Sequence, residues 1–406
     1  MKNRLLSALL FLLSAFSGPV IAQQSNDFIN VSPDVKYQYI GTYDVAHLNS
    51  ILTTEASGFS DFNVTYTPAN YPVKLYRVVY NSVIPELNDK PTVASGLIAI
   101  PETVTKKIPV VSYQHGTVFT KTEAPSSPEE TMETRLMIAQ FASQGYILIA
   151  ADYFGKGLSE EPDSYQVKES TQQACLDMMS ASYEIFKAMK IEPGQLFLSG
   201  WSMGSWSTLL FLEMLESLGI KVAAAAMACT PTDIYALFSR WMHAPKETDA
   251  VWLPGILALQ LNSNSIYYQL PGLMESAVKQ EYQQATLDFY QNKITYEEFY
   301  SKTPNKVVEY LKPEFIESSS IGKERYWQIL QNNNSYRWRS KTPLNLYYGD
   351  SDEAVPEYIA TLPVGYQQLI GGAQTISTPA GKLADHRGTF KFSVAHQKNW
   401  FDGMKE

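Results

Sequence analysis

The sequence is short of three things: cysteine, clustered basic residues and long apolar segments. Cys175 and Cys229 are its only cysteines, which leaves open one disulfide or two buried free thiols. The net charge is −9 and no basic cluster would follow a phosphate backbone, which argues against nucleic acid as a partner. After the first residues no stretch is long and apolar enough to span a bilayer, so we expect no stable membrane insertion.

Motifs that hold cofactors are also missing. The sequence has no metal-ligand spacing, no glycine-rich loop that would cradle a phosphate and no dinucleotide fingerprint. We therefore expect neither a metal nor another cofactor.

The N-terminus has the pattern of a secretory signal peptide. Lys2 and Arg4 precede an apolar stretch from Leu5 to Phe16. Val20-Ile21-Ala22 follows, with short side chains at its first and last positions, as at a cleavage site. The apolar stretch is shorter than the roughly 20 residues of a spanning helix. Residues 1–22 are therefore predicted to be removed before Gln23, and the mature protein is expected to be exported, either to the periplasm or out of the cell.

The rest of the chain predicts an α/β fold. Residues from Val35 to Glu102 read as antiparallel strands, and after Pro101 short apolar strands alternate with amphipathic helices. This alternation indicates a mostly parallel central sheet flanked by helices. The expected strands include Ile108–Tyr113, Tyr146–Ala151, Gln195–Ser199, Val222–Ala228, Leu344–Tyr348 and Ala373–Ser377, and the expected helices include 131–145, 170–190, 205–218 and 388–401.

Residues 231–340 interrupt this alternation with a helical pattern. We interpret them as a cap or lid inserted into a core made of residues 23–230 and 341–406. A cap at this point lies over the strand ends, where ligands bind in such sheets. The segment is rich in aromatic residues, and such a cap facing a nucleophile implies an apolar substrate pocket.

The central motif is Gly200-Trp201-Ser202-Met203-Gly204, which lies between an expected strand and an expected helix. This is the setting of a nucleophile elbow, in which a strained turn projects the serine hydroxyl from the sheet edge. The glycines have a steric reason, because strand and helix close on each other there. Ser202 is therefore the candidate nucleophile, and the Met203 N–H at the helix start is a candidate oxyanion donor.

A serine nucleophile needs a base and an acid that orients the base, and in this kind of fold both follow the serine along the chain. Three carboxylates follow the strand that ends at Tyr348. Asp352 is our choice because it lies at the far side of the turn, close to where packed structure resumes, whereas Asp350 and Glu353 remain as alternatives.

Two histidines follow the acid. His386 lies in an expected loop after the last strand, from which a base could reach both the serine and the acid, so it is the candidate base. His396 lies inside the last expected helix, where a packed histidine is the ordinary explanation. His243 in the cap and His47 before the main sheet are both expected to be structural.

The second half of an oxyanion hole should come from the loop after Tyr113, which reads Gln114-His115-Gly116-Thr117. Thr117 or Gly116 would supply the amide. His115 precedes the serine and is expected to hold this loop by hydrogen bonding.

Five motifs in this order resemble the α/β-hydrolase superfamily: Tyr113–Thr117, Ala151–Gly157, Gly200–Gly204, Gly349–Pro356 and Asp385-His386. The likeness is greatest to its secreted bacterial and fungal lipases and carboxylesterases with a lid. It covers residues 112–233 and 341–401. The His-Gly-Thr loop departs from the Gly-Gly-Gly type of many short-chain esterases and is similar to that of enzymes for longer acyl chains.

The resemblance implies that Ser202 is the nucleophile, Asp352 the acid and His386 the base, with the Met203 and Thr117 amides in the oxyanion hole. The expected function is that of a secreted serine hydrolase, an esterase or lipase that cleaves small ester substrates with an apolar acyl or aromatic group. Two alternatives stay open. One is a serine peptidase of the prolyl-peptidase branch, and the other is a non-catalytic protein that binds an apolar ligand.

Overall fold

The computed structural model describes residues 27–103 and 105–405, and the predicted signal peptide lies outside these residues. A ten-stranded sheet runs through the core, with strand order β1-β2-β3-β4-β6-β5-β7-β8-β9-β10. Its strands are β1 (Ile29–Asn30), β2 (Val35–Tyr43), β3 (Val73–Ile84), β4 (Lys90–Pro101), β5 (Lys107–Gln114), β6 (Ile147–Ala151), β7 (Glu192–Trp201), β8 (Ala224–Ala228), β9 (Leu344–Gly349) and β10 (Thr375–Gly381).

The sheet has an antiparallel part and a parallel part, as the sequence predicts. Strands β1 to β4 pair antiparallel with their neighbours, and β4 joins β6 in the same sense. From β6 to β10 every pair is parallel. Parallel strands need crossover connections, and the helices between them provide these.

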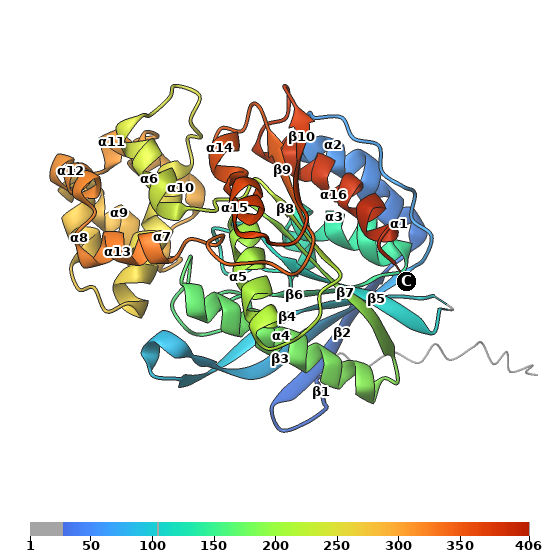
Figure 1. The fold of residues 1–406 in the computed structure, drawn as a ribbon. Helices are drawn as coiled ribbons and strands as arrows, with labels where there is room; N and C mark the ends of the chain where they lie inside the picture. The colour runs from blue at the N-terminus through green and yellow to red at the C-terminus, as the bar shows by residue number, and fades with distance from the viewer. Residues whose placement is uncertain (1–26, 104, 406) are drawn as a thin grey trace, which may run out of the picture.

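The helices form two groups (Figure 1). Those packed along the sheet are α1 (Val45–Ser50), α2 (Ala56–Phe59), α3 (Met132–Phe141), α4 (Lys168–Ala188), α5 (Met203–Ser217), α14 (Glu357–Ala360), α15 (Leu362–Ile370) and α16 (His386–Asp402). Those between β8 and β9, here called the cap, are α6 (Ile234–His243), α7 (Leu253–Tyr267), α8 (Leu273–Ala277), α9 (Gln280–Tyr290), α10 (Tyr296–Lys302), α11 (Val307–Tyr310), α12 (Pro313–Ile321) and α13 (Arg325–Asn332).

Both faces of the parallel strands are buried. In β6, Ile147 and Ile149 belong to the apolar cluster under α4 and α5, whereas Leu148 and Ala150 belong to the cluster under α3 and α16. Successive side chains of a strand point to opposite faces, so a strand covered on both sides reads as a continuous apolar run. The sequence pattern of these strands is explained by this arrangement.

The two cysteines are buried and unpaired. Cys175 lies in α4 and packs in the cluster on one face of the sheet, whereas Cys229 follows β8 and packs in the cluster on the other face. The disulfide that the sequence left open is therefore not formed. Within the described ranges, no helix is both long enough and apolar enough to cross a membrane.

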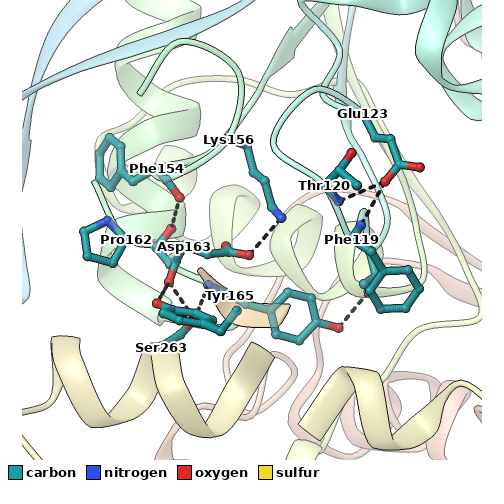
Figure 2. A network of polar contacts seen from close by, with 12 residues as sticks. Phe119, Thr120, Glu123, Phe154, Lys156, Pro162, Asp163, Tyr165 and Ser263 are labelled. Atoms are coloured by element: carbon teal, nitrogen blue, oxygen red, sulfur yellow. Dashed lines mark hydrogen bonds and ion pairs between the residues drawn. The ribbon is translucent and has the colours of Figure 1, made fainter. Parts of the chain in front are cut away.

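The cap is fastened to the core at the segment that follows β6. The Ser263 hydroxyl of α7 donates to the Asp163 carbonyl at 2.6 Å and accepts from the Tyr165 N–H at 3.1 Å. The Tyr290 hydroxyl of α9 donates to the same Asp163 carbonyl at 2.7 Å. Figure 2 shows this network, in which the Asp163 carboxylate also forms a buried ion pair with Lys156 at 2.9 Å.

Candidate active site

Ser202 lies in a strained turn between β7 and α5. Its φ is 55° and its ψ is −126°, a conformation that serine rarely adopts. The Ser202 N–H donates to the Ala228 carbonyl at 2.9 Å, which ties the turn to the end of the next strand. The strand, turn and helix predicted around this residue are confirmed. Backbone strain of this kind persists where the surrounding structure enforces it, as in functional sites.

The glycines beside Ser202 permit close contacts of the backbone. A Cβ atom on Gly204 would lie 2.0 Å from the Gln114 carbonyl oxygen and 2.5 Å from the His115 carbonyl oxygen. A Cβ atom on Gly200 would lie 2.4 Å from the Gly204 carbonyl oxygen. No side chain fits at such distances, so the two glycines let α5 approach both its own strand and the 114–117 loop.

Asp352 and His386 are hydrogen-bonded to each other. The imidazole Nδ1 lies 3.0 Å from both carboxylate oxygens of Asp352. The Ala354 and Val355 N–H groups each donate to Asp352 Oδ1 at 2.9 Å, which fixes the carboxylate. Both side chains are at least 95% buried. His386 differs from expectation in one respect, because it is the first residue of α16 instead of part of a loop.

The alternative acids lie elsewhere in the same turn. Asp350 is exposed to solvent. Glu353 does contact His386, but it accepts from the backbone N–H at 3.0 Å and not from the ring. Of the three carboxylates, the hydrogen bonds place Asp352 alone on the imidazole.

Burial and charge act in opposite directions on this pair. Burial by itself lowers the pKa of His386, but the charge and hydrogen bond of Asp352 outweigh it and hold the pKa above its ordinary value. Burial likewise favours a raised pKa for Asp352, and the interactions with His386 and two backbone N–H groups hold it below its ordinary value. The site thus favours an ionised aspartate beside an imidazole that readily takes up a proton.

Two tryptophans flank the imidazole. The Trp201 ring, next to Ser202, lies 5.2 Å from the His386 ring between centroids, and its Nε1–H donates to the His386 carbonyl at 3.2 Å. These contacts bring the base beside the elbow. The Trp252 ring of the cap lies 5.6 Å from the His386 ring. The cap residue could not be selected from sequence, because nothing in its local pattern separates it from the other cap aromatics.

The 114–117 loop is held by side chains on both sides. The Gly116 N–H donates to Glu133 Oε1 at 2.7 Å, and the Tyr113 hydroxyl donates to the same oxygen. The Gly116 carbonyl accepts from His115 Nδ1 at 2.8 Å, and the His115 ring stacks on Tyr153 with centroids 4.4 Å apart. The predicted role of His115 in holding this loop is confirmed.

Of the two amides expected to face an oxyanion from this loop, the Gly116 N–H is therefore engaged with Glu133. The Thr117 N–H has no hydrogen bond to another described residue, and the Thr117 hydroxyl pairs with the Tyr165 hydroxyl at 2.7 Å. The Met203 N–H, at the first position of α5, is one of the donors that a helix leaves without an intrahelical acceptor.

Sequence reasoning missed Glu133. Its side chain is buried in the first turn of α3, and burial raises its pKa to about 7, although its hydrogen bonds and the charge of His386 act against this shift. One signal was available, because a carboxylate stands among the buried apolar residues of a helix. Such residues rarely lie in a core without a specific partner.

The remaining histidines have structural surroundings. His396 Nδ1 lies 3.0 Å from the Tyr347 hydroxyl, and its ring stacks on Phe392. His243 Nε2 lies 2.7 Å from the Ser319 hydroxyl within the cap. His47 lies in α1, and its ring packs at a tilt of 51° against the Tyr43 ring, with centroids 4.5 Å apart.

One group of three side chains has the atoms that bind metals. Ligand atoms of Cys229, Asp352 and His386 lie within 4.8 Å of one another. In this arrangement His386 Nδ1 already faces Asp352, whose Oδ1 accepts two backbone N–H groups, and the Cys229 thiol donates to the His386 carbonyl at 3.5 Å. These hydrogen bonds account for the closeness of the three side chains and orient Asp352 and His386 as an acid–base pair.

The chain resembles known proteins in sequence and in fold. A model of the family described as secretory lipase matches residues 122–362, more than half of the chain. No curated protein matches the chain. The fold is that of the predicted α/β-hydrolases, because the solved structures that resemble it include enzymes of this type.

Three of these structures cover most of the chain. A protein from Legionella pneumophila, solved as a candidate hydrolase, is 22% identical with a TM-score of 0.82, and the match covers 93% of this chain and 98% of that one. A rice cell wall degrading esterase, LipA from Xanthomonas oryzae, is 19% identical with a TM-score of 0.78, covering 94% and 99%. Candida antarctica lipase A in its closed state is 16% identical with a TM-score of 0.64, covering 91% and 83%.

Proposed function

The chain belongs to the secretory lipase family, which makes ester hydrolysis its chemistry, and we propose that it performs this reaction with Ser202, His386 and Asp352. The observation that carries the proposal is the buried hydrogen bond between Asp352 and His386, next to a serine held in a strained turn. A protein that only binds a ligand needs neither of these features.

The proposed reaction is a two-step acyl transfer. His386 takes the Ser202 proton while the serine oxygen attacks the ester carbonyl carbon. The bond to the alcohol oxygen then breaks, and His386 returns the proton to the leaving alcohol, which leaves the acyl group on Ser202. Water attacks this acyl-enzyme by the same route and releases the acid.

Asp352 fixes the tautomer of the imidazole, because its carboxylate accepts the Nδ1–H and leaves Nε2 as the nitrogen assigned to take the Ser202 proton. It also stabilises the imidazolium that forms in each step, which agrees with the raised pKa of His386. The Met203 and Thr117 N–H groups are assigned to the negative charge that develops on the carbonyl oxygen.

The substrate is proposed to carry an apolar acyl or aromatic group. Phe119, just after the 114–117 loop, stacks on Tyr296 of the cap with centroids 4.5 Å apart and lies 5.7 Å from Phe289. The Trp252 ring of the cap lies 5.6 Å from the His386 ring. Aromatic side chains of the cap beside the base and beside the residue that follows the 114–117 loop favour an apolar part of the substrate over a charged one.

The test is hydrolysis of p-nitrophenyl esters from acetate to palmitate, beside an amino-acyl anilide. We expect ester turnover that is lost in Ser202→Ala, and turnover lower by roughly 10⁴-fold in Asp352→Asn because the imidazole adopts the wrong tautomer. Asp350→Asn is the matched control, since Asp350 is exposed in the same turn. Ester turnover that survives in Ser202→Ala would contradict the assignment of the nucleophile. A preference for the anilide would instead favour a peptidase.

Export is proposed from the N-terminal pattern together with the name of the family. N-terminal sequencing of the mature protein is expected to begin at Gln23. A mature chain that keeps Met1 would contradict this part of the proposal.

A further inference from the structure

Gly116 is held by two residues that the proposed acyl transfer does not use directly. Glu133 accepts its N–H at 2.7 Å, and His115 donates to its carbonyl oxygen at 2.8 Å. Both side chains are almost completely buried, so neither contact is weakened by competing bulk water. Glu133 comes from α3 and His115 from the loop itself, so the backbone of Gly116 is fixed from two directions.

The orientation of the next amide follows from this arrangement. The Gly116 carbonyl and the Thr117 N–H belong to one peptide unit, which is planar and trans. In such a unit the N–H and the C=O point in opposite directions. Because the carbonyl faces the His115 ring, the Thr117 N–H points away from that ring.

Glu133 has the features of a dedicated acceptor. Within the described residues it forms no salt bridge, and the hydrogen bonds from the Gly116 N–H and the Tyr113 hydroxyl meet at the same oxygen, Oε1. A buried carboxyl group without a cation costs stability. A role in shaping the 114–117 loop accounts for its presence beside the elbow.

We propose that Glu133 is a positioning residue of the acyl-transfer site, which anchors Gly116 through its N–H and so holds the loop in which the Thr117 N–H is directed at the oxyanion. The inference rests on the proposed function. Glu133 touches neither substrate nor nucleophile in this account and acts through the backbone of the loop.

The experiment compares two substitutions of similar size. Glu133→Gln keeps an oxygen that can accept from Gly116, whereas Glu133→Met fills the same space without an acceptor. Gln140→Met is the matched control, because it makes the same kind of change at another buried position of α3. For each variant we would measure kcat and KM with the best ester, the affinity for an alkylboronic acid and the thermal unfolding midpoint.

A boronic acid bound to the serine is tetrahedral and places an oxygen where the oxyanion forms, so it reports on the oxyanion donors. We expect Glu133→Met to lower kcat and weaken boronate binding by roughly 10- to 100-fold with little change in KM, as for a misplaced oxyanion donor. Glu133→Gln should restore both to within about threefold of the native enzyme, and Gln140→Met should leave both unchanged.

Native kcat and boronate affinity in Glu133→Met would overturn the proposal. So would an equal loss in Glu133→Gln, because the charge and not the hydrogen bond would then matter. If Glu133→Met does not fold, Glu133→Asp tests the same point, since it withdraws the carboxylate by one methylene. Ester turnover that survives Ser202→Ala would instead overturn the proposed function, whereas full activity in Glu133→Met with an inactive Ser202→Ala would overturn only the role of Glu133.

Discussion

Two backbone segments meet at the candidate active site, and they are held in different ways. The 200–204 turn owes its shape to glycines, because Gly200 and Gly204 remove the side chains that would separate α5 from its neighbours. The 114–117 loop owes its shape to partners, because Glu133 and His115 bind the two polar groups of Gly116. The first segment depends on free space, and the second depends on hydrogen bonds to buried titratable groups.

This difference has a physical consequence. A segment shaped by close packing should fail when volume is added, and it should be insensitive to pH. A segment shaped by buried titratable groups should tolerate conservative changes of volume and respond to pH.

Gly204→Ala is expected to have the largest effect. Its Cβ would overlap the carbonyl oxygens of Gln114 and His115, which are backbone atoms that cannot rotate away. We expect a loss of about 1–3 kcal/mol in the free energy of unfolding. Turnover should fall by roughly 100-fold or more, because the Met203 and Thr117 donors are pushed apart.

Gly365→Ala is the control for that experiment, since Gly365 lies in α15 with open space around its Cα. It should leave turnover unchanged and raise stability slightly, as an alanine does in a helix. Urea unfolding and ester turnover check both variants. Native turnover in Gly204→Ala would show that the contact between α5 and the loop is not required.

The free energy of unfolding should depend on pH through His115 and Glu133, the two residues that hold Gly116. Burial lowers the pKa of His115 from 6.5 to about 4. Between these pH values the unfolded chain binds a proton at His115 and the folded chain does not. The free energy of unfolding therefore falls as the pH drops from 6.5 to 4. Burial raises the pKa of Glu133 from 4.5 to about 7. Between these pH values the folded chain binds a proton at Glu133 and the unfolded chain does not. The free energy of unfolding therefore falls as the pH rises from 4.5 to 7.

The two contributions have opposite signs and are each about 3 kcal/mol, so they largely cancel in the native chain. Relative to the native protein, His115→Gln should therefore gain stability as the pH is lowered from 7 to 4.5, and Glu133→Gln should lose it. Urea midpoints at both pH values measure this difference, in which the contributions of all other groups cancel. Parallel pH curves for the three proteins would contradict the burial of these charges.

The smallest effects are expected where only a side chain changes and the backbone donor stays. Thr117→Val removes the hydrogen bond to Tyr165, which is worth about 1 kcal/mol, but it keeps the Thr117 N–H. Met203→Leu conserves volume beside the second donor. We expect turnover within about fivefold of native for the first variant and within about twofold for the second. A larger loss in either would mean that the side chain and not the amide serves the oxyanion.

The same contrast explains what the sequence could reveal. The elbow is local, so five consecutive residues with strand and helix on either side predicted it. The parallel strands could also be predicted from sequence, because both of their faces are buried and their apolar runs are therefore continuous. Asp352 and His386 could be placed in order along the chain, but their hydrogen bond depends on β9, β10 and α16 meeting at one sheet edge.

Residues whose contacts are distant in sequence could not be selected from the sequence. Glu133 is 17 positions from Gly116, and its role depends on how α3 packs beside β5. Trp252 reaches His386 only because the cap lies over the strand ends. The helices between β8 and β9 were predicted from periodicity, whereas their attachment through the Asp163 carbonyl depends on contacts 100 and 127 residues apart in sequence.

The buried, unpaired thiols of Cys175 and Cys229 determine how the protein can be produced. Because the sheet separates them, the native state contains no disulfide between them, and no oxidant or isomerase is needed to form one. Expression of residues 23–406 in the reducing cytoplasm of a bacterial host, where both thiols stay reduced during folding, should therefore yield active enzyme. Activity should also be indifferent to added dithiothreitol, which makes reducing buffers safe for purification and storage.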